Sequence, residues 1–159
     1  NNTNYIAPLG IRLGMLGQMG WYISGRMNQD SYRSSPSYKF DGDKVLDYQA
    51  NQYYEFNGQL NYPLFSVTGG LSYYLGGSFH LHLGAGYGSK QVLRQINEFT
   101  YSDDQKTGES FVIDNNYTAK GYVLEGGITY HTHPVVLNLG LSTVNIDYSS
   151  IVLGVGVSF

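Results

Sequence analysis

The sequence predicts an all-β protein, an antiparallel up-and-down β-barrel of about eight strands that spans a membrane as a single domain, residues 1–159. Apolar side chains alternate with small or polar ones in seven separate stretches, which is the period of a β-strand. Only 13% of the residues are charged, against roughly 25% in ordinary soluble domains. The charges gather in two long polar segments between the alternating stretches, as expected for strands that cross a lipid layer.

Residues 151–159 show the alternation most clearly. The odd positions are all apolar and end on Phe159, while Gly154, Gly156 and Ser158 stand on the other face. A half-buried strand of a soluble protein carries polar residues on its second face, because that face meets water. An apolar face opposite a face of small residues instead favours a narrow closed barrel with lipid outside.

Six earlier stretches repeat this pattern and are separated by alternately short and long connections. Short turns are expected at 17–20, 76–78, 131–134 and around 145–147. The length of each alternating stretch is close to the ~9–11 residues of a tilted membrane-spanning strand. The seven predicted strands cover residues 9–15, 21–28, 64–75, 79–90, 121–130, 135–142 and 151–159.

Two long polar segments, residues 29–58 and about 96–117, are predicted to be extracellular loops. Residues 29–58 and 95–117 together hold 14 of the chain's 21 charged residues. Asp41-Gly42 is expected to close a small hairpin between 38–40 and 45–46, since Asp-Gly favours tight turns. The segments are acidic and rich in Asn and Tyr, which also suits a surface that contacts protein or glycan. The aromatic residues predicted for this surface are Tyr32, Tyr38, Tyr48, Tyr53, Tyr54 and Phe56.

The pattern resembles that of small bacterial outer-membrane barrels of the OmpX and OmpA kind. The resemblance implies an outer-membrane location with a periplasmic C-terminus, and lipid and lipopolysaccharide as surroundings. It also implies that Val155, Val157 and Phe159 form the signal read by the barrel-assembly machinery. That family has an even number of strands, so an eighth strand is expected upstream of Asn1, from another chain or inside a long loop, the first being preferred.

Three charged residues lie in the middle of predicted strands, and all three share the inward face. They are Arg12, Arg26 and Glu125. A charge on the lipid face would cost ~2–4 kcal/mol near the midplane, so this placement supports the predicted register. An ion-pair network that fills the lumen is the preferred interpretation, with a small polar conduit as the alternative.

The four histidines are the next residues considered for a chemical role, as ligands of a metal ion. His80 and His82 lie two residues apart on the inward face, and His131 and His133 lie at a short turn of the same rim. A metal site is the less favoured interpretation of these histidines, because no carboxylate neighbours them in the sequence. Cysteine is absent, and no cofactor is predicted.

The preferred functional interpretation is a non-enzymatic barrel that anchors, or belongs to, a larger cell-envelope complex. The alternatives are a lipid-modifying outer-membrane enzyme, a small adhesin or ligand-binding barrel, and a soluble carrier resembling a lipocalin. The soluble carrier is disfavoured, since it would expose the apolar stripes to water. A net charge of −3 gives no reason to expect a nucleic-acid partner.

Overall fold

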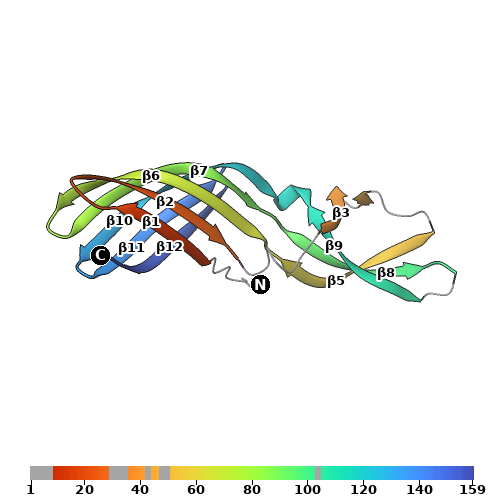
Figure 1. Ribbon diagram of the computed structural model, residues 1–159. Helices are drawn as coiled ribbons and strands as arrows, with labels where there is room; N and C mark the ends of the chain where they lie inside the picture. Colours follow the sequence, from red (N-terminus) through yellow and green to blue (C-terminus); the bar gives the residue numbers. More distant parts are fainter. Residues whose placement is uncertain (1–8, 29–35, 42–43, 47–50, 103–104) are drawn as a thin grey trace. The chain divides into compact units, whose positions relative to one another are not determined.

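The computed structural model describes residues 9–28, 36–41, 44–46, 51–102 and 105–159, and almost all of them lie in β-strands (Figure 1). The chain forms two compact units. One consists of 9–26, 65–89 and 119–159, and the other is built from the described residues of 27–64 and 90–118. Because each unit carries its own sheet, the two are described separately.

The first unit is a seven-stranded antiparallel sheet in the order β1-β2-β6-β7-β10-β11-β12. Strands that follow one another in the chain are neighbours in the sheet wherever a short turn joins them, so the sheet is an up-and-down meander. All seven predicted strands are present, and each observed end lies within three residues of the expected one. The strands are β1 (Leu9–Met15), β2 (Met19–Met27), β6 (Leu64–Gly76), β7 (Phe79–Lys90), β10 (Ala119–Thr132), β11 (Val135–Val144) and β12 (Tyr148–Val157).

Two of the short connections contain residues with positive φ. Gly76 and Gly77 join β6 to β7 with φ of 114° and 62°, values that glycine reaches at little steric cost. Between β11 and β12, Asn145 and Ile146 also take positive φ. In the register between β11 and β12, Leu139 is paired with Leu153. This register aligns the apolar residues of the two strands on one face.

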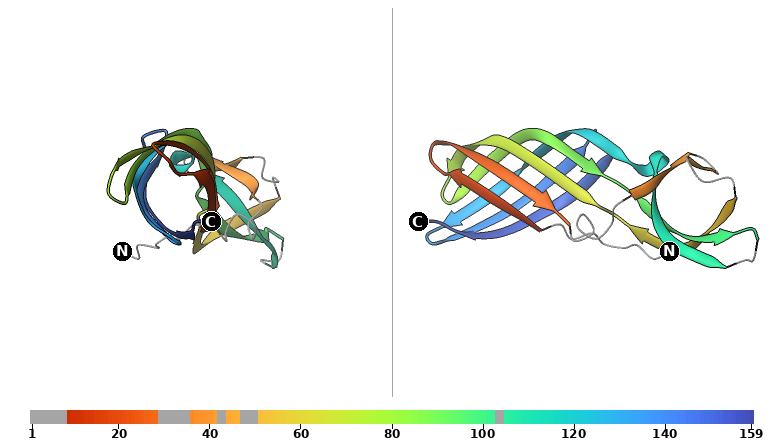
Figure 2. Two further views of the ribbon diagram at one scale, coloured as in Figure 1. Left: turned by 60° about the vertical axis from the view of Figure 1, so that its left-hand side comes forward. Right: turned by 45° about the vertical axis from the view of Figure 1, so that its right-hand side comes forward.

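This sheet curls strongly, forming a half-barrel (Figure 2). Its inner, concave face carries buried polar residues, whereas the large apolar side chains point outward from all seven strands. Leu139, in the middle of β11, is 57% exposed, while Glu125 on the inner face of β10 is 4% exposed. The polarity of a soluble domain is therefore reversed in this unit.

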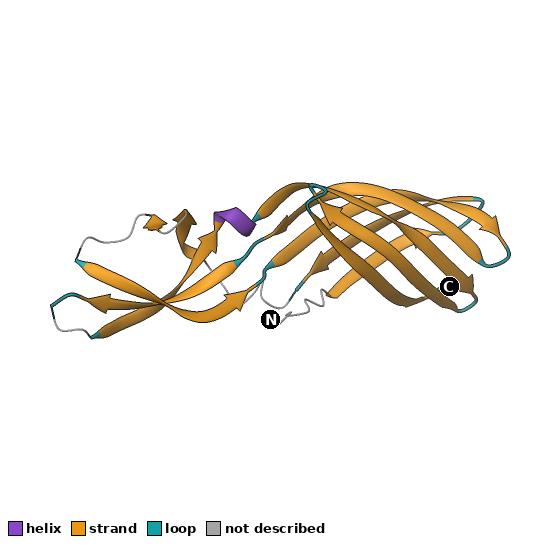
Figure 3. Ribbon diagram, turned by 180° about the vertical axis from the view of Figure 1, so that it is seen from behind, coloured by secondary structure: helices purple, strands orange, loops and turns teal. Residues whose placement is uncertain are grey.

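The second unit is a five-stranded sheet in the order β4-β3-β9-β8-β5. Its pairings are antiparallel except that of β3 with β9, which is parallel. A 3₁₀ turn, η1 (Asn115–Tyr117), follows β9 and is the purple element of Figure 3. The strands are β3 (Pro36–Asp41), β4 (Lys44–Leu46), β5 (Gln52–Asn61), β8 (Leu93–Thr100) and β9 (Lys106–Asp114).

A small apolar core stabilises this second sheet. Phe40, Val45, Ile96 and Val112 are buried together, and Tyr38 and Tyr54 pack against them. Since these residues come from β3, β4, β8 and β9, with Tyr54 from β5, every strand contributes to the core. The second unit therefore has an interior of its own.

The prediction that the two polar segments are simply long loops is wrong. They contain the five strands of this sheet, of which the sequence predicted only the small hairpin. That hairpin is confirmed, with Phe40 paired to Val45, although its tip at residues 42–43 lies outside the described residues. The remaining strands were missed because they mix charged and apolar residues without strict alternation, and because β5 is bulged at Gly58, where φ is 81°.

Among the described residues, no helix is long and apolar enough to cross a membrane.

Candidate functional site

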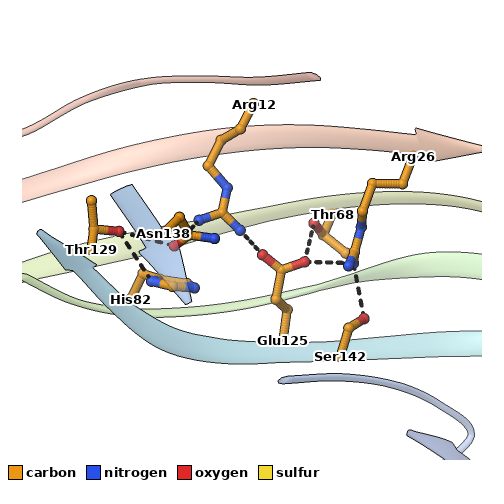
Figure 4. Close-up of polar contacts among 8 residues, drawn as sticks. All are labelled: Arg12, Arg26, Thr68, His82, Glu125, Thr129, Asn138 and Ser142. Carbon is orange, nitrogen blue, oxygen red and sulfur yellow. Dashed lines mark hydrogen bonds and ion pairs between the residues drawn. The ribbon is translucent and has the colours of Figure 1, made fainter. Parts of the chain in front are cut away.

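The candidate site is a cluster of polar side chains on the inner face of the seven-stranded sheet (Figure 4). Alternation along each strand places these residues inward, and the curl of the sheet brings distant strands together. We call this group the polar cluster. It consists of Arg12, Arg26, Thr68, His82, Glu125, Thr129, Asn138 and Ser142.

Glu125 is the centre of the polar cluster. Its Oε1 accepts a hydrogen bond from Nη2 of Arg12, and its Oε2 accepts one from Nη2 of Arg26 at 2.6 Å. Thr68 donates to the same Oε2 at 3.3 Å, and Arg26 also donates to Ser142 Oγ at 2.9 Å. Both carboxylate oxygens are therefore occupied, and the charge is shared between two guanidinium groups.

Arg12 extends the network to β11. Its Nη1 donates to Asn138 Oδ1 at 3.0 Å, and Thr129 donates to the same oxygen at 3.1 Å. The Thr129 hydroxyl also lies 3.4 Å from Nδ1 of His82. One continuous set of hydrogen bonds thus connects strands β1, β2, β6, β7, β10 and β11.

An aromatic side chain closes one side of the cluster. The guanidinium of Arg12 lies 4.3 Å from the ring centroid of Tyr22, within the range of a cation–π interaction. The Tyr22 ring also meets His82 edge to face at 5.6 Å. Glycines make room for this ring, because a Cβ at Gly84 would lie 2.9 Å from Tyr22 Cζ.

The chemistry of the polar cluster is that of a structural network. A buried carboxylate must be paired and hydrogen-bonded to offset the cost of leaving water, and Glu125 is both. A general base needs a free lone pair directed at a substrate, whereas the oxygens of Glu125 already accept bonds from three side chains. The network therefore ties together strands that are far apart in the sequence.

The structure brings together Arg12, Arg26, Glu125 and His82, four of the five inward residues singled out from the sequence. The fifth, His80, is also buried on the inner face, but its ring contacts are with Tyr74 and His131. Sequence reasoning missed the neutral members of the cluster, above all Asn138. Alternation along each strand predicts that these residues face inward, but only the curl of the sheet shows which inward residues meet.

The histidines lie in two places. His82 belongs to the polar cluster, and the His80 and His131 rings are 6.3 Å apart near the short turns. His131 Nε2 lies 3.0 Å from Ser158 Oγ, and Nδ1 of His133 lies 3.4 Å from the same oxygen. Across the described residues, no group of three or more His, Asp or Glu could hold a metal ion.

The predicted assembly signal lies on the outer face at the end of the chain. Val155 is 84% exposed, and Val157 and Phe159 are exposed as well. On the opposite face of β12, Gly154 and Gly156 have no close neighbours that a Cβ would displace, the nearest atoms being 3.4 Å and 3.9 Å away. The last strand therefore combines an apolar outer edge with an open inner side.

A second set of side chains lies on the five-stranded sheet, and of its aromatic members the sequence singled out only Tyr53. The Tyr53 and Phe99 rings stack at 5.1 Å, and Tyr101 lies 5.2 Å from Tyr53. Elsewhere Arg94 pairs with the buried Asp114 at 2.7 Å. Register on β5 and β8 could have suggested the stack, since Tyr53 is the direct partner of Phe99.

The aromatic residues predicted for a contact surface are largely occupied within their own sheet. Tyr38 and Tyr54 pack on the core, and Phe56 contacts Phe40 edge to face at 5.4 Å. Tyr32 and Tyr48 lie outside the described residues. Tyr53, which stacks on Phe99 and lies beside the tilted ring of Tyr101, is the member of that set that belongs to a partly exposed aromatic group.

An ion pair between Lys106 and Glu109 on this sheet changes the pKa of the carboxylate. Lys106 donates a hydrogen bond to Glu109, and this bond together with the charge of Lys106 lowers the pKa of Glu109. Gln95 donates to the other oxygen at 2.8 Å. The carboxylate is exposed, so the pair contributes little to stability.

No protein-family model, curated protein or solved structure matches the chain.

Proposed function

We propose that this protein is an integral β-barrel of a bacterial outer membrane that acts as a non-enzymatic anchor for its second, five-stranded unit. The observation that carries the proposal is the reversed polarity of the seven-stranded sheet. Its outer face exposes leucine, isoleucine and valine from every strand, while Arg26 and Glu125 are buried inside. Water penalises such an arrangement, and lipid favours it.

The free energy of burying apolar side chains supports lipid rather than water as the surroundings of the outer face. Moving one large apolar side chain out of water contributes about 1.5–3 kcal/mol. The outer face presents many of them, and each is at least 37% exposed. They include Ile11, Leu13, Ile23, Val67, Leu71, Leu81, Leu83, Leu124, Ile128, Leu137, Leu139, Leu141, Ile151, Leu153 and Val155.

Aromatic side chains on the outer face support the same proposal. Trp21 and Phe79 lie near the short turns, and Tyr87 and Tyr122 lie towards the other ends of their strands. Two belts of aromatic residues are what the two interfaces of a membrane favour. We place the short turns and Phe159 on the periplasmic side, as in the barrels that the sequence resembles.

The proposed role as an anchor rests on the chemistry of the inner face. The polar cluster pairs the carboxylate of Glu125 with two guanidinium groups and fills the space between strands, so neither a wide water channel nor a free catalytic carboxylate is expected. The second unit has its own core and an aromatic stack, and we propose it as the part that contacts other envelope proteins. Lipid, lipopolysaccharide and the barrel-assembly machinery are the further proposed partners.

Membrane fractionation followed by gel mobility tests the proposal. Expressed with an export signal, the chain should sediment with outer membranes, resist carbonate extraction and migrate faster in unheated than in heated samples. Purification in mild detergent should then retain partner proteins, which mass spectrometry would identify. A protein that stays soluble without detergent would contradict the proposal.

A lipid-modifying enzyme is the second candidate, and one observation favours it. Ser158 and His131 are within hydrogen-bond reach, as a nucleophile and its base must be. The candidate predicts that cells expressing the protein contain altered lipid A and that Ser158→Ala abolishes the change. If mass spectra of lipid A are identical with and without the protein, this alternative is wrong.

A further inference from the structure

A wide bulge, residues 57–59, interrupts β5 of the five-stranded sheet. The pairing of β5 with β8 is regular up to Phe56 and resumes at Leu60, so the whole bulge opposes a single residue, Gln95. Among the described residues β5 is also the edge strand of its sheet, and no strand pairs with its other side. The backbone of the bulge therefore lies outside the regular ladder on both sides.

The peptide bond between Asn57 and Gly58 is open to solvent. Both residues are exposed, and so is Gln59 after them. Gly58 has a φ of 81°, a conformation that glycine adopts at little steric cost. A Cβ built at Gly58 would meet no atom within 4 Å. Neither a side chain of its own nor a neighbouring group thus crowds this peptide bond on that side.

The side chain of Asn57 is held against its own backbone. Its Oδ1 accepts a hydrogen bond from the backbone N–H of Gln59 at 2.9 Å, which forms an Asx turn. The ring closed by this hydrogen bond contains both the carboxamide carbon, Cγ, and the backbone nitrogen of Gly58. The donated N–H also stabilises negative charge that develops on Oδ1 when Cγ is attacked. An electrophilic carbon and a nitrogen that can attack it are therefore kept in one small ring.

We propose that Asn57 is a site of spontaneous deamidation in the folded protein. The Gly58 nitrogen loses its proton to hydroxide and attacks Cγ of Asn57, forming a C–N bond. The bond between Cγ and Nδ2 then breaks, and Nδ2 takes a proton from water and leaves as ammonia. Water opens the resulting five-membered succinimide at one of its two carbonyl groups. The products are aspartate and isoaspartate, and the reaction consumes only water.

The other asparagines of the chain lack this combination of features. Asn57 is the only asparagine in the sequence that precedes a glycine, and a side chain on the following residue hinders the attack. Asn97 illustrates the opposite surroundings, because in β8 it pairs with Glu55 on one side and with Glu109 on the other. Ring closure at a residue paired on both sides requires the sheet to open locally, whereas the bulge requires no opening.

Deamidation changes the surface of the five-stranded sheet more than its pairing. Each event adds one negative charge, and isoaspartate also adds one carbon atom to the main chain of β5. The added atom lies between the two paired stretches of this strand, Gln52–Phe56 and Leu60–Asn61, where the register is already interrupted. The modified chain therefore keeps its fold and acquires a new charge and shape on the unit proposed to contact other envelope proteins. The reaction itself does not depend on that proposed role.

Ageing of the purified full chain tests the proposal. Protein in detergent and mildly alkaline buffer is sampled over time, digested at acid pH and read by mass spectrometry. We expect the peptide that contains Asn57 to show conversion of carboxamide to carboxyl, as a mixture of aspartate and isoaspartate. A synthetic peptide of residues 52–62 gives the rate without the fold.

The folded chain should react within about tenfold of the peptide, which corresponds to barriers that differ by no more than about 1.4 kcal/mol. A folded chain that reacts more slowly than this, or in which Asn57 stays unmodified, would overturn the proposal. Asn57→Gln keeps a carboxamide but would need a larger ring, so the acidic forms seen on isoelectric focusing of the aged protein should be lost. If they accumulate equally in this variant, the reactive site lies elsewhere and the proposal is wrong.

Glu98→Gly is the matched control for the bulge, because it places a glycine after Asn97 in a strand that is paired on both sides. In the folded variant, checked by circular dichroism, Asn97 should react at least about tenfold more slowly than Asn57. In short synthetic peptides the two sites should react at similar rates. Equal rates in the folded variant would show that the bulge does not determine the reactivity and would contradict the proposal.

Discussion

At the scale of single residues, the inner face of the seven-stranded sheet depends on Glu125. This carboxylate is 4% exposed and joins Arg12 of β1 to Arg26 of β2 and Thr68 of β6. Removing one partner of a buried ion pair costs more than the pair itself contributes, because the remaining charge is left without compensation. Glu125 is therefore the residue whose loss the sheet should tolerate least.

Glu125→Gln keeps the shape and one acceptor but removes the charge, leaving two guanidinium groups facing each other. We expect a loss of about 3–5 kcal/mol in the free energy of unfolding. Urea titration in lipid vesicles would measure it, with the single tryptophan, Trp21, as the fluorescent probe. Asp147→Asn, at an exposed carboxylate, is the matched control and should change stability by less than about 0.5 kcal/mol.

A triple variant separates charge from packing. Arg12→Met, Arg26→Met and Glu125→Leu together remove every charge of the polar cluster and leave none unpaired. Replacement of a whole buried ion-pair network by apolar residues is often neutral or stabilising. If the triple variant were as unstable as Glu125→Gln, charge compensation would not explain the effect.

At the scale of elements, the strands pack closely because glycine alternates with larger residues on the inner face. A Cβ at Gly86 of β7 would lie 2.6 Å from Thr68 Cα and would also meet the Val67 carbonyl oxygen of β6. Backbone atoms cannot move aside as a side-chain tip can. By contrast, a Cβ at Gly25 of β2 would meet no atom within 4 Å.

Gly86→Ala should therefore destabilise the seven-stranded sheet by about 1–3 kcal/mol, the usual range for overpacking. Gly25→Ala is the matched control and should be neutral or slightly stabilising, because alanine restricts the unfolded chain. The same urea titration measures both variants. Equal effects at the two positions would argue against close contact between β6 and β7.

The five-stranded sheet has a different source of stability, the small apolar core around Ile96. This side chain has no exposed surface, whereas Leu60, in β5 of the same sheet, is 38% exposed. Ile96→Ala should cost about 2–5 kcal/mol, and Leu60→Ala should cost less. Hydrogen exchange read by mass spectrometry should show faster exchange in β8 and β9, while exchange in β11 is unchanged.

At the scale of the whole molecule, the two units obey opposite rules of polarity. The five-stranded sheet buries Ile96 and Val112, as a protein in water does. The seven-stranded sheet buries Arg26 and Glu125 and exposes Leu139. One chain thus combines a part suited to lipid with a part suited to water, which is the basis of the proposed anchor.

The effect of an arginine on the outer face should depend on its depth. Leu139→Arg lies in the middle of β11 and should cost about 2–4 kcal/mol if lipid surrounds it, while Val135→Arg, at the start of the same strand, should cost about 0–1 kcal/mol. Unfolding in vesicles measures both. In a water-soluble sheet both changes would be nearly neutral, so equal small effects would contradict the membrane proposal.

The sequence by itself determined the seven strands of the first sheet and which face of each is apolar. Strict alternation is a local property, and it places Leu139 outward and Glu125 inward whatever the rest of the chain does. The tertiary structure alone decided which inward residues meet, as with Arg12 and Asn138, because the curl of the sheet sets that distance. It also decided that the polar segments form a second sheet, since the core around Ile96 is assembled from strands far apart in the chain, each too weakly patterned to be recognised alone.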